Sequence, residues 1–425
     1  MKLISLIFLG YCLSIQVVNA QTDLIPLKNN QFFSSLQAIK AGNSFIDVCT
    51  GHAAPAIYDF NKDGKEDLIV GEFGNKYCPD VDSTQSHAYV QARCRIYLNE
   101  GSNSNPVYNH FTYLMASGKA AYVPNTCCNS FVPRFLDLDG DDIVDIISGS
   151  YPGEIYFFKG TKDNQFEKGI QLKDHHNNIM HPAHSAPAEP VDWNGDGLTD
   201  ILVSSRGTGE YIILNIGDKK NYKFSVPQKI ELEPFEYYYK HLEQIRKAKA
   251  THLICSDWDN DGLFDLIGGC ENSQIVFYKN IGSKTEAKFA KPILLWDMSN
   301  EQSDDMNYNL IGGRLKLFIY DYNKDGKKDL LVGDVIDKKI KIRDLSPKEE
   351  YRKKILDDKI LAISKELYGN GGGFKRMNNP KTPKSEKKEL MKLDQQFNKL
   401  YDKTKKYEVY KHDGSHGYVW VLTGK

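Results

Sequence analysis

Short apolar runs alternate with polar, glycine-containing loops along most of this chain. One kind of loop follows an apolar strand pattern, at residues 55–59, 133–137, 252–257 and 316–321. A second β-favouring run comes after that loop, and a third run begins at Arg95, Glu154, Tyr211 and Gln274. Because short apolar runs bounded by turn residues are typical of strands, the pattern predicts about four strands per unit, the fourth one ragged.

An acidic motif of nine residues marks each of these loops. Five copies share one frame, with Asp at positions 1, 5 and 9 and Asp or Asn at position 3, and they begin at Asp59, Asp137, Asp192, Asp257 and Asp321. The intervals between their first residues are 78, 55, 65 and 64. This spacing is too regular for unrelated loops and too uneven for a rigid solenoid, so it predicts a blade-like repeat.

The oxygen atoms of this motif suit a hard cation. Position 6 is Gly in four copies, as a tight loop with positive φ favours, and Asp142 in the second. Side-chain oxygens at positions 1, 3, 5 and 9, with the carbonyl of residue 7, form a shell of the kind that Ca²⁺ accepts. We therefore expect about five Ca²⁺ sites, with ligands Asp59, Asn61, Asp63, Asp67, Asp137, Asp139, Asp141, Asp145, Asp192, Asn194, Asp196, Asp200, Asp257, Asp259, Asp261, Asp265, Asp321, Asn323, Asp325 and Asp329.

The motif has two alternative interpretations. An EF-hand requires Glu at position 12 and a helix after it, but position 12 is Val70, Ser148, Val203, Gly268 and Val332. A metal-free turn rich in Asp, Asn and Gly is the other alternative, and five copies in register count against it.

Over roughly residues 45–345 the chain resembles the FG-GAP/VCBS repeat family, whose calcium loops occur in integrin α-subunit heads and many secreted bacterial proteins. The resemblance implies an all-β fold, a β-propeller with Ca²⁺ loops between the first two strands of each blade. It implies no single activity, because one fold hosts many functions.

The interval lengths predict five motif-bearing blades, with six or seven as open alternatives. The predicted divisions are a signal peptide at 1–20, a propeller at 21–345, a helical hairpin insertion at 346–406 and propeller-closing terminal strands at 407–425. The terminal segment is expected to form two strands around a turn and to join N-terminal residues.

The first residues predict export. Lys2, an apolar run and the small residue Ala20 are typical of a cleavable signal peptide, with an uncleaved anchor as the alternative. We expect a secreted, periplasmic or cell-surface protein with no other membrane-crossing stretch. The chain carries 55 basic and 56 acidic residues, so without the leader and with five Ca²⁺ its net charge would be about +8. An acidic ligand fits this excess, although plain solubility explains it too; no nucleic-acid partner is expected.

The insertion is predicted to contain two helices. Ser346 and Glu349 form a capping-box pattern, and an apolar stripe runs from Leu356 to Leu367. The second helix would place Leu390, Leu393, Phe397, Leu400 and Tyr401 on one face, and residues 381–406 hold nine Lys against four acids. We expect this hairpin to dock on the propeller, with a partner-binding arm as the alternative.

Cysteine and histidine side chains recur at one position before the first three motifs. These residues are Cys49, His52, Cys127, Cys128, His181 and His184. At a channel mouth they would suit Zn²⁺ or copper, whereas a disulfide from Cys49 to the vicinal pair is the preferred alternative. The sequence also allows disulfides between Cys78 and Cys94 and between Cys255 and Cys270.

No familiar catalytic signature occurs in the sequence. The favoured function is therefore a calcium-binding propeller that serves as a binding, adhesion or scaffold module for a carbohydrate or protein ligand. A propeller-fold polysaccharide lyase is the enzymatic alternative, and it would use His181, His184 and Tyr237–Tyr239 on uronic acids.

Overall fold

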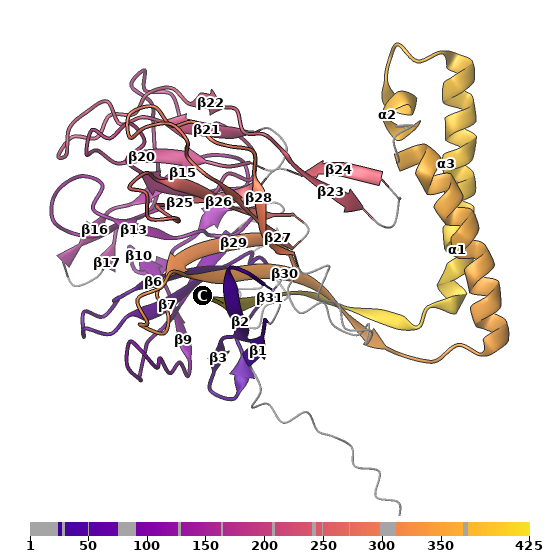
Figure 1. The fold of residues 1–425 in the computed structure, drawn as a ribbon, viewed down its shortest axis with the longest axis horizontal. Helices are drawn as coiled ribbons and strands as arrows, with labels where there is room; N and C mark the ends of the chain where they lie inside the picture. The colour runs from indigo at the N-terminus through magenta and orange to yellow at the C-terminus, as the bar shows by residue number, and fades with distance from the viewer. Residues whose placement is uncertain are drawn as a thin grey trace, which may run out of the picture.

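The computed structural model describes residues 24–27, 30–49, 51–74, 91–125, 129–162, 165–205, 209–239, 244–248, 250–271, 273–297, 312–368 and 373–425. In these residues, six small sheets of four to six strands form a β-propeller (Figure 1). Five of the sheets carry one motif each, which confirms the all-β propeller and its five motif-bearing blades. The sixth sheet has no motif.

The five motif-bearing sheets are named blades 1 to 5 in chain order. Blade 1 contains β6 (Ala54–Tyr58), β7 (Asp67–Glu72), β8 (Gln91–Tyr97), β9 (Phe111–Tyr113) and β12 (Val123–Pro124). Blade 2 contains β13 (Arg134–Leu136), β14 (Asp145–Gly149), β15 (Ile155–Phe158) and β18 (Ile170–Gln171). Blade 3 contains β19 (Ala188–Val191), β20 (Asp200–Val203), β21 (Glu210–Ile213) and β22 (Gln228–Ile230).

Blades 4 and 5 follow the same antiparallel order. Blade 4 contains β25 (Ala250–Ser256), β26 (Asp265–Cys270), β27 (Gln274–Tyr278) and β28 (Ile293–Asp297). Blade 5 contains β29 (Gly313–Tyr320), β30 (Asp329–Lys341), β31 (Tyr410–Gly424), β2 (Phe33–Ala38) and β1 (Leu24–Pro26), and β5 (Asp47–Cys49) also pairs with β31. The ring is therefore closed by strands from both ends of the chain.

The sixth sheet joins the outer parts of blades 1 and 2. Its strands are β10 (Met115–Ala116), β11 (Lys119–Ala120), β16 (Gly160–Thr161) and β17 (Gln165–Phe166), and β10 pairs with β17 in parallel. Two of these strands come from the 78-residue interval and two from the 55-residue interval that follows it. Two hairpins complete the strands, β3 (Lys40–Ala41) with β4 (Ser44–Phe45), and β23 (Phe235–Tyr239) with β24 (Gln244–Ala248).

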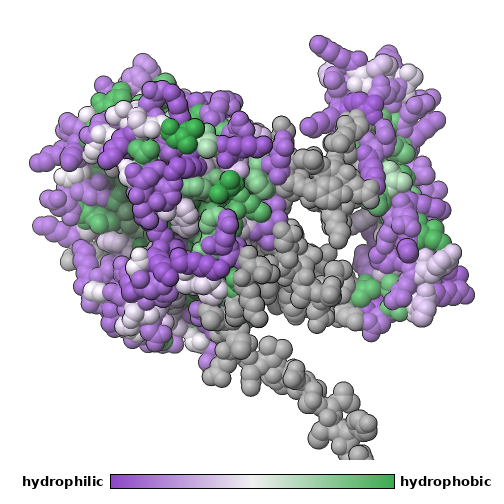
Figure 2. Space-filling view, in the orientation of Figure 1, coloured by the Kyte–Doolittle hydropathy of each residue, from purple (hydrophilic) through white to green (hydrophobic). Residues whose placement is uncertain are grey.

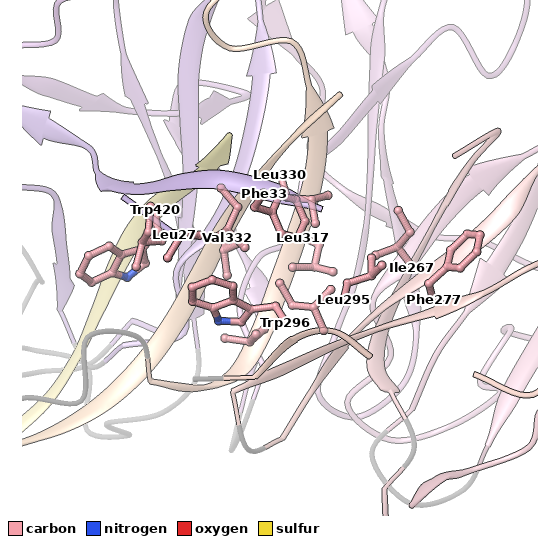
Figure 3. Close-up of a cluster of buried hydrophobic side chains, with 14 of the residues drawn as sticks. Leu27, Phe33, Ile267, Phe277, Leu295, Trp296, Leu317, Leu330, Val332 and Trp420 are labelled. Atoms are coloured by element: carbon pink, nitrogen blue, oxygen red, sulfur yellow. The ribbon is translucent and has the colours of Figure 1, made fainter. Parts of the chain in front are cut away.

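Apolar side chains fill the space between neighbouring blades. Between blades 4 and 5, Trp296, Leu317 and Trp420 belong to one buried cluster (Figure 3). Glycines in the second strands allow the blades to approach closely. A Cβ on Gly149 would lie 1.5 Å from the backbone oxygen of Ala186 on the next blade, so no larger residue fits there without a backbone shift.

The insertion between β30 and β31 is helical, as predicted. It contains α1 (Pro347–Tyr368), α2 (Gly373–Asn378), α3 (Lys384–Thr404) and the short helix η4 (Lys405–Tyr407). The Glu349 carboxylate accepts a hydrogen bond from the Ser346 backbone N–H at 2.9 Å, as a capping box requires. No helix in the described part of the chain is long and apolar enough to cross a membrane.

Two expectations about this region are wrong. The helices do not dock on the blades: Ile363, Leu367 and Leu390 form a separate small core, and the helices stand beyond the end of the β30–β31 ladder (Figure 1). Most of their visible surface is hydrophilic (Figure 2). The terminal segment is also one long strand, β31, rather than two strands around a turn, because its first part pairs with the extended end of β30.

Candidate metal loops and central channel

The five acidic loops share one backbone arrangement, and each connects the first and second strands of its blade. The carboxylate at position 1 accepts two backbone N–H groups of its own loop, or three in loop 2. In loop 1, Asp59 accepts hydrogen bonds from Asp63 at 3.1 Å and Gly64 at 3.0 Å. Loop 2 departs from Gly at position 6, and Asp142 itself adopts the left-handed conformation there, with φ 64°. The motif therefore fixes the same tight loop in every blade.

The carboxylate at position 9 is fully buried in every blade. These residues are Asp67, Asp145, Asp200, Asp265 and Asp329. Each accepts one N–H from position 2 of its loop and one from the end of the third strand. Asp67, for example, binds Phe60 N at 2.9 Å and Asn99 N at 2.8 Å. The ninth residue thus ties the loop to the third strand of the same blade.

Carboxylate oxygens converge in the loops that have Asp at position 3. Potential ligand atoms of Asp137, Asp139 and Asp145 lie within 4.8 Å of one another, and the same is true of Asp257, Asp259 and Asp265. Burial raises the pKa of Asp145 to about 6, and the nearby Asp139 carboxylate adds to this. Burial likewise raises the pKa of Asp200 to about 6. Removing water from these carboxylates therefore disfavours their charged form.

Two lysines divide the loops into two types. In loop 2, Lys159 Nζ contacts Asp139 and lies 2.6 Å from Asp141 Oδ2; in loop 4, Lys279 Nζ contacts Asp259 and lies 2.7 Å from Asp261 Oδ2. Loops 1, 3 and 5 have Asn at position 3, and their motif aspartates form no ion pair within the described ranges. Each lysine thus offsets the extra carboxylate of its loop.

Sequence reasoning missed these lysines, although a signal was present. Both stand 22 residues after the first Asp of their motif, and they occur in the two copies that have Asp at position 3. The equivalent residues in the other blades, which precede the N–H donor to position 9, are Leu98, Leu214 and Thr423.

Arg134, in the inner strand of blade 2, contacts the inner strands of three other blades. Arg134 Nη2 donates to the Leu317 carbonyl oxygen at 2.9 Å, and its Nε pairs with Glu189. His252 lies beside it, with Nε2 3.3 Å from Arg134 Nη2. These contacts join blades 2, 3, 4 and 5 across the axis. Arg134 and Glu189 also line a pocket of about 250 Å³.

The predicted cysteine and histidine cluster is only partly described. His181 and His184 lie together with ring centroids 5.5 Å apart, and both are exposed. His52 is buried, stacks on Phe73 and lies 3.4 Å from Arg314 Nη1. Cys127, Cys128 and the side chain of Cys49 lie outside the described part. In the part that is described, loops 2 and 4 are the places where three or more His, Cys, Asp or Glu side chains lie close enough to share a metal ion.

The proposed pairing of Cys255 with Cys270 is wrong. Both are free thiols, because the register places Cys255 opposite Leu266 and Cys270 opposite Ala250 on the β25–β26 ladder. Cys94 is also a free thiol, buried in blade 1, and its suggested partner Cys78 lies outside the described residues.

Comparison with family models agrees with the repeat. Residues 137–203 match the model of the FG-GAP-like repeat. The chain carries an FG-GAP-like repeat. The match begins at the second motif, covers the last three strands of blade 2 and extends through the third motif to the end of β20. It supports the predicted FG-GAP resemblance. No curated protein matches the sequence.

Proposed function

We propose that this chain is a secreted, calcium-stabilised propeller that acts as a binding, adhesion or scaffold module for a carbohydrate or protein ligand. The burial of all five position-9 carboxylates is the observation that carries the calcium part. None of them forms an ion pair within the described residues, and buried carboxylates are costly without a partner.

The donor set fits calcium. Carboxylate and amide oxygens at positions 1, 3, 5 and 9 would hold the ion, and each carboxylate has further lone pairs beyond those that accept backbone N–H groups. Bound calcium would supply positive charge, which Lys159 and Lys279 bring only to loops 2 and 4. It would also hold the first three strands of each blade together through residue 9.

The structural role of the motif aspartates favours a binding function over catalysis. Their oxygens accept the backbone N–H groups that shape the loops, so they support structure. The lyase alternative rests on His181 and His184, because the side chains of Tyr237–Tyr239 lie outside the described part. A Zn²⁺ or copper site at Cys49, His52 and their neighbours, and export through residues 1–20, stay proposals from the sequence.

The test is elemental analysis of natively purified protein by plasma mass spectrometry. We expect about five Ca per chain and a fall of one Ca when Asp192 and Asp196 are both changed to Asn. The matched control is Asp218→Asn with Glu231→Gln, which removes two charges from the exposed surface of blade 3. Fewer than one Ca per chain would contradict the calcium part. Glycan and protein arrays then test retention without turnover.

A further inference from the structure

A second candidate site lies between blades 1 and 2, away from the metal loops. It is a cleft of about 700 Å³, within the roughly 300–1,000 Å³ of small-ligand sites. The sixth sheet forms one wall and blade 2 forms another. The polar side chains that matter for its chemistry are Gln91, Lys119, Tyr122, Tyr156, Lys168 and Gln171.

The charge of this cleft is positive. Lys119 and Lys168 are exposed, and neither forms an ion pair with any carboxylate in the described part of the chain. The residues that line the cleft include no Asp or Glu. Two unpaired ammonium groups in one concave surface favour an anionic ligand.

The uncharged polar side chains of the cleft can form hydrogen bonds with the hydroxyl groups of a ligand. Gln171 Nε2 donates to the Tyr156 hydroxyl oxygen at 3.2 Å, so the tyrosine O–H can still donate and the amide oxygen can still accept. Such donor and acceptor pairs suit sugar hydroxyls, which both donate and accept. Tyr122 is 40% exposed and offers a flat apolar ring beside them.

The wall that carries the lysines is held in place. Ser117 N donates to the Phe166 carbonyl oxygen at 2.8 Å, and Lys168 N donates to Ser117 Oγ at 2.9 Å. These bonds fix the turn before Lys119 against the segment that holds Lys168. A site whose backbone is already ordered loses less entropy when a ligand binds.

We propose that this cleft binds an acidic saccharide, with its carboxylates at Lys119 and Lys168 and a sugar ring against Tyr122. The inference rests on the proposed binding function and names its site and ligand class. Hydroxyl-matching groups and an open ring favour a saccharide over an acidic peptide, which serves as a comparison in the test.

The test uses calorimetry on the full calcium-loaded chain with trigalacturonate as the probe. We expect trigalacturonate to bind. The fully methyl-esterified trisaccharide, whose carboxylates carry no charge, should bind at least tenfold more weakly than trigalacturonate, and so should triglutamate. Lys119→Gln with Lys168→Gln should weaken trigalacturonate binding at least tenfold. Lys220→Gln with Lys284→Gln removes the same charge from blades 3 and 4 and should leave binding unchanged.

Tyr122 provides the second measurement. Tyr122→Ala should weaken both the acid and the ester, whereas Tyr122→Phe should keep the affinity of each. If the Lys119/Lys168 and Lys220/Lys284 double variants lost the same affinity for trigalacturonate, the site would be wrong, because only general charge attraction would explain the binding. If triglutamate bound more tightly than trigalacturonate, the assignment of a saccharide as the ligand would be wrong. Retention of another ligand on arrays, unaffected by the Lys119 and Lys168 changes, would overturn the cleft but leave the propeller's binding role intact.

Discussion

Asp334 is a carboxyl group whose ionisation the fold opposes. It is fully buried in β30, and burial raises its pKa to about 7 although three donors face it. These donors are Gly312 N at 2.7 Å, Tyr418 N at 2.7 Å and Trp420 Nε1 at 3.1 Å. The nearby Asp47 carboxylate raises the pKa further, so the protonated form is favoured up to neutral pH.

Stability should therefore fall as pH rises through this range. In the unfolded chain the carboxyl has its ordinary pKa of 3.8, so the folded state binds the extra proton between pH 4 and 7. With calcium in excess, the free energy of unfolding should drop by on the order of 2 kcal/mol from pH 5 to pH 8. Denaturant titrations at several pH values measure it. Asp334→Asn should flatten the slope, whatever its absolute stability, and an unchanged slope would contradict this assignment.

Lys159 should compete with calcium at loop 2. Lys159→Gln removes the cation beside Asp139 and Asp141, so calcium should bind that loop about fivefold more tightly, the gain expected from losing an exposed ion pair of about 1 kcal/mol. Lys279→Gln should do the same at loop 4. Calcium titration against a chromophoric chelator resolves the change, with Lys220→Gln as the control. Weaker binding in Lys159→Gln would show that the lysine supports the site instead.

The sequence predicts motif residues better than their partners. The positions of Asp59 and Asp67 follow from a local nine-residue frame, so the loop could be inferred directly. Lys159 and Arg134 act across strands or blades, and which strand ends meet depends on register and ring closure. Charged residues in such positions look like ordinary surface residues until the blades are placed.

The helical arm, α1 to α3, is an element with its own small core. Ile363, Leu367 and Leu390 are buried among the helices, and the paired strands β30 and β31 lead to them. Residues Lys341 and Tyr410 pair at the far end of that ladder. The two chain ends left by removing the arm would therefore lie side by side.

Deletion of residues 342–409, with an Asn-Gly link between Lys341 and Tyr410, should leave the propeller folded. A two-residue turn of this type suits a hairpin, and the propeller core loses no buried side chain. We expect a melting temperature within a few degrees of the full chain by circular dichroism. Loss of cooperative melting would show that the arm supports the blades.

The terminal strand shows where local turn signals mislead. Asp413 and Gly414 form a dipeptide typical of a hairpin turn, and Gly414 does have φ of 124°. In the structure the strand passes through this dipeptide with a bulge and does not turn back, because β30 extends to Lys341 and pairs with it on both sides of the bulge. A long-range pairing thus overrides a local preference, which no single segment of sequence reveals.

Ring closure governs the stability of the whole molecule. β31 lies between β30 and β2, and it buries Val419, Trp420, Val421 and Leu422. At about 1.5–3 kcal/mol for each buried side chain, this strand contributes an amount comparable to the total stability of a typical domain, about 5–15 kcal/mol.

Truncation after residue 406 should therefore abolish cooperative folding. The loss would expose the edges of β2 and β30 and remove the Gly424 N–H that binds Asp329 at 2.8 Å. Near-ultraviolet circular dichroism and urea titration measure the effect. The matched control removes Lys425 alone, which follows the last strand residue and should change little. A truncated chain that melted at the original temperature would refute this role of β31.

The position of β31 in the sequence also determines how long β30 stays unpaired during synthesis. β30 ends at Lys341 and its partner begins at Tyr410, so 68 residues must be made before that edge is covered. At roughly 5–20 residues per second, the wait is about 3–14 s. Helices form within microseconds, so the arm can fold while the ring is still open. During synthesis the unpaired edge of β30 is thus the surface most exposed to wrong partners, and a chaperone that shields it would act in that interval.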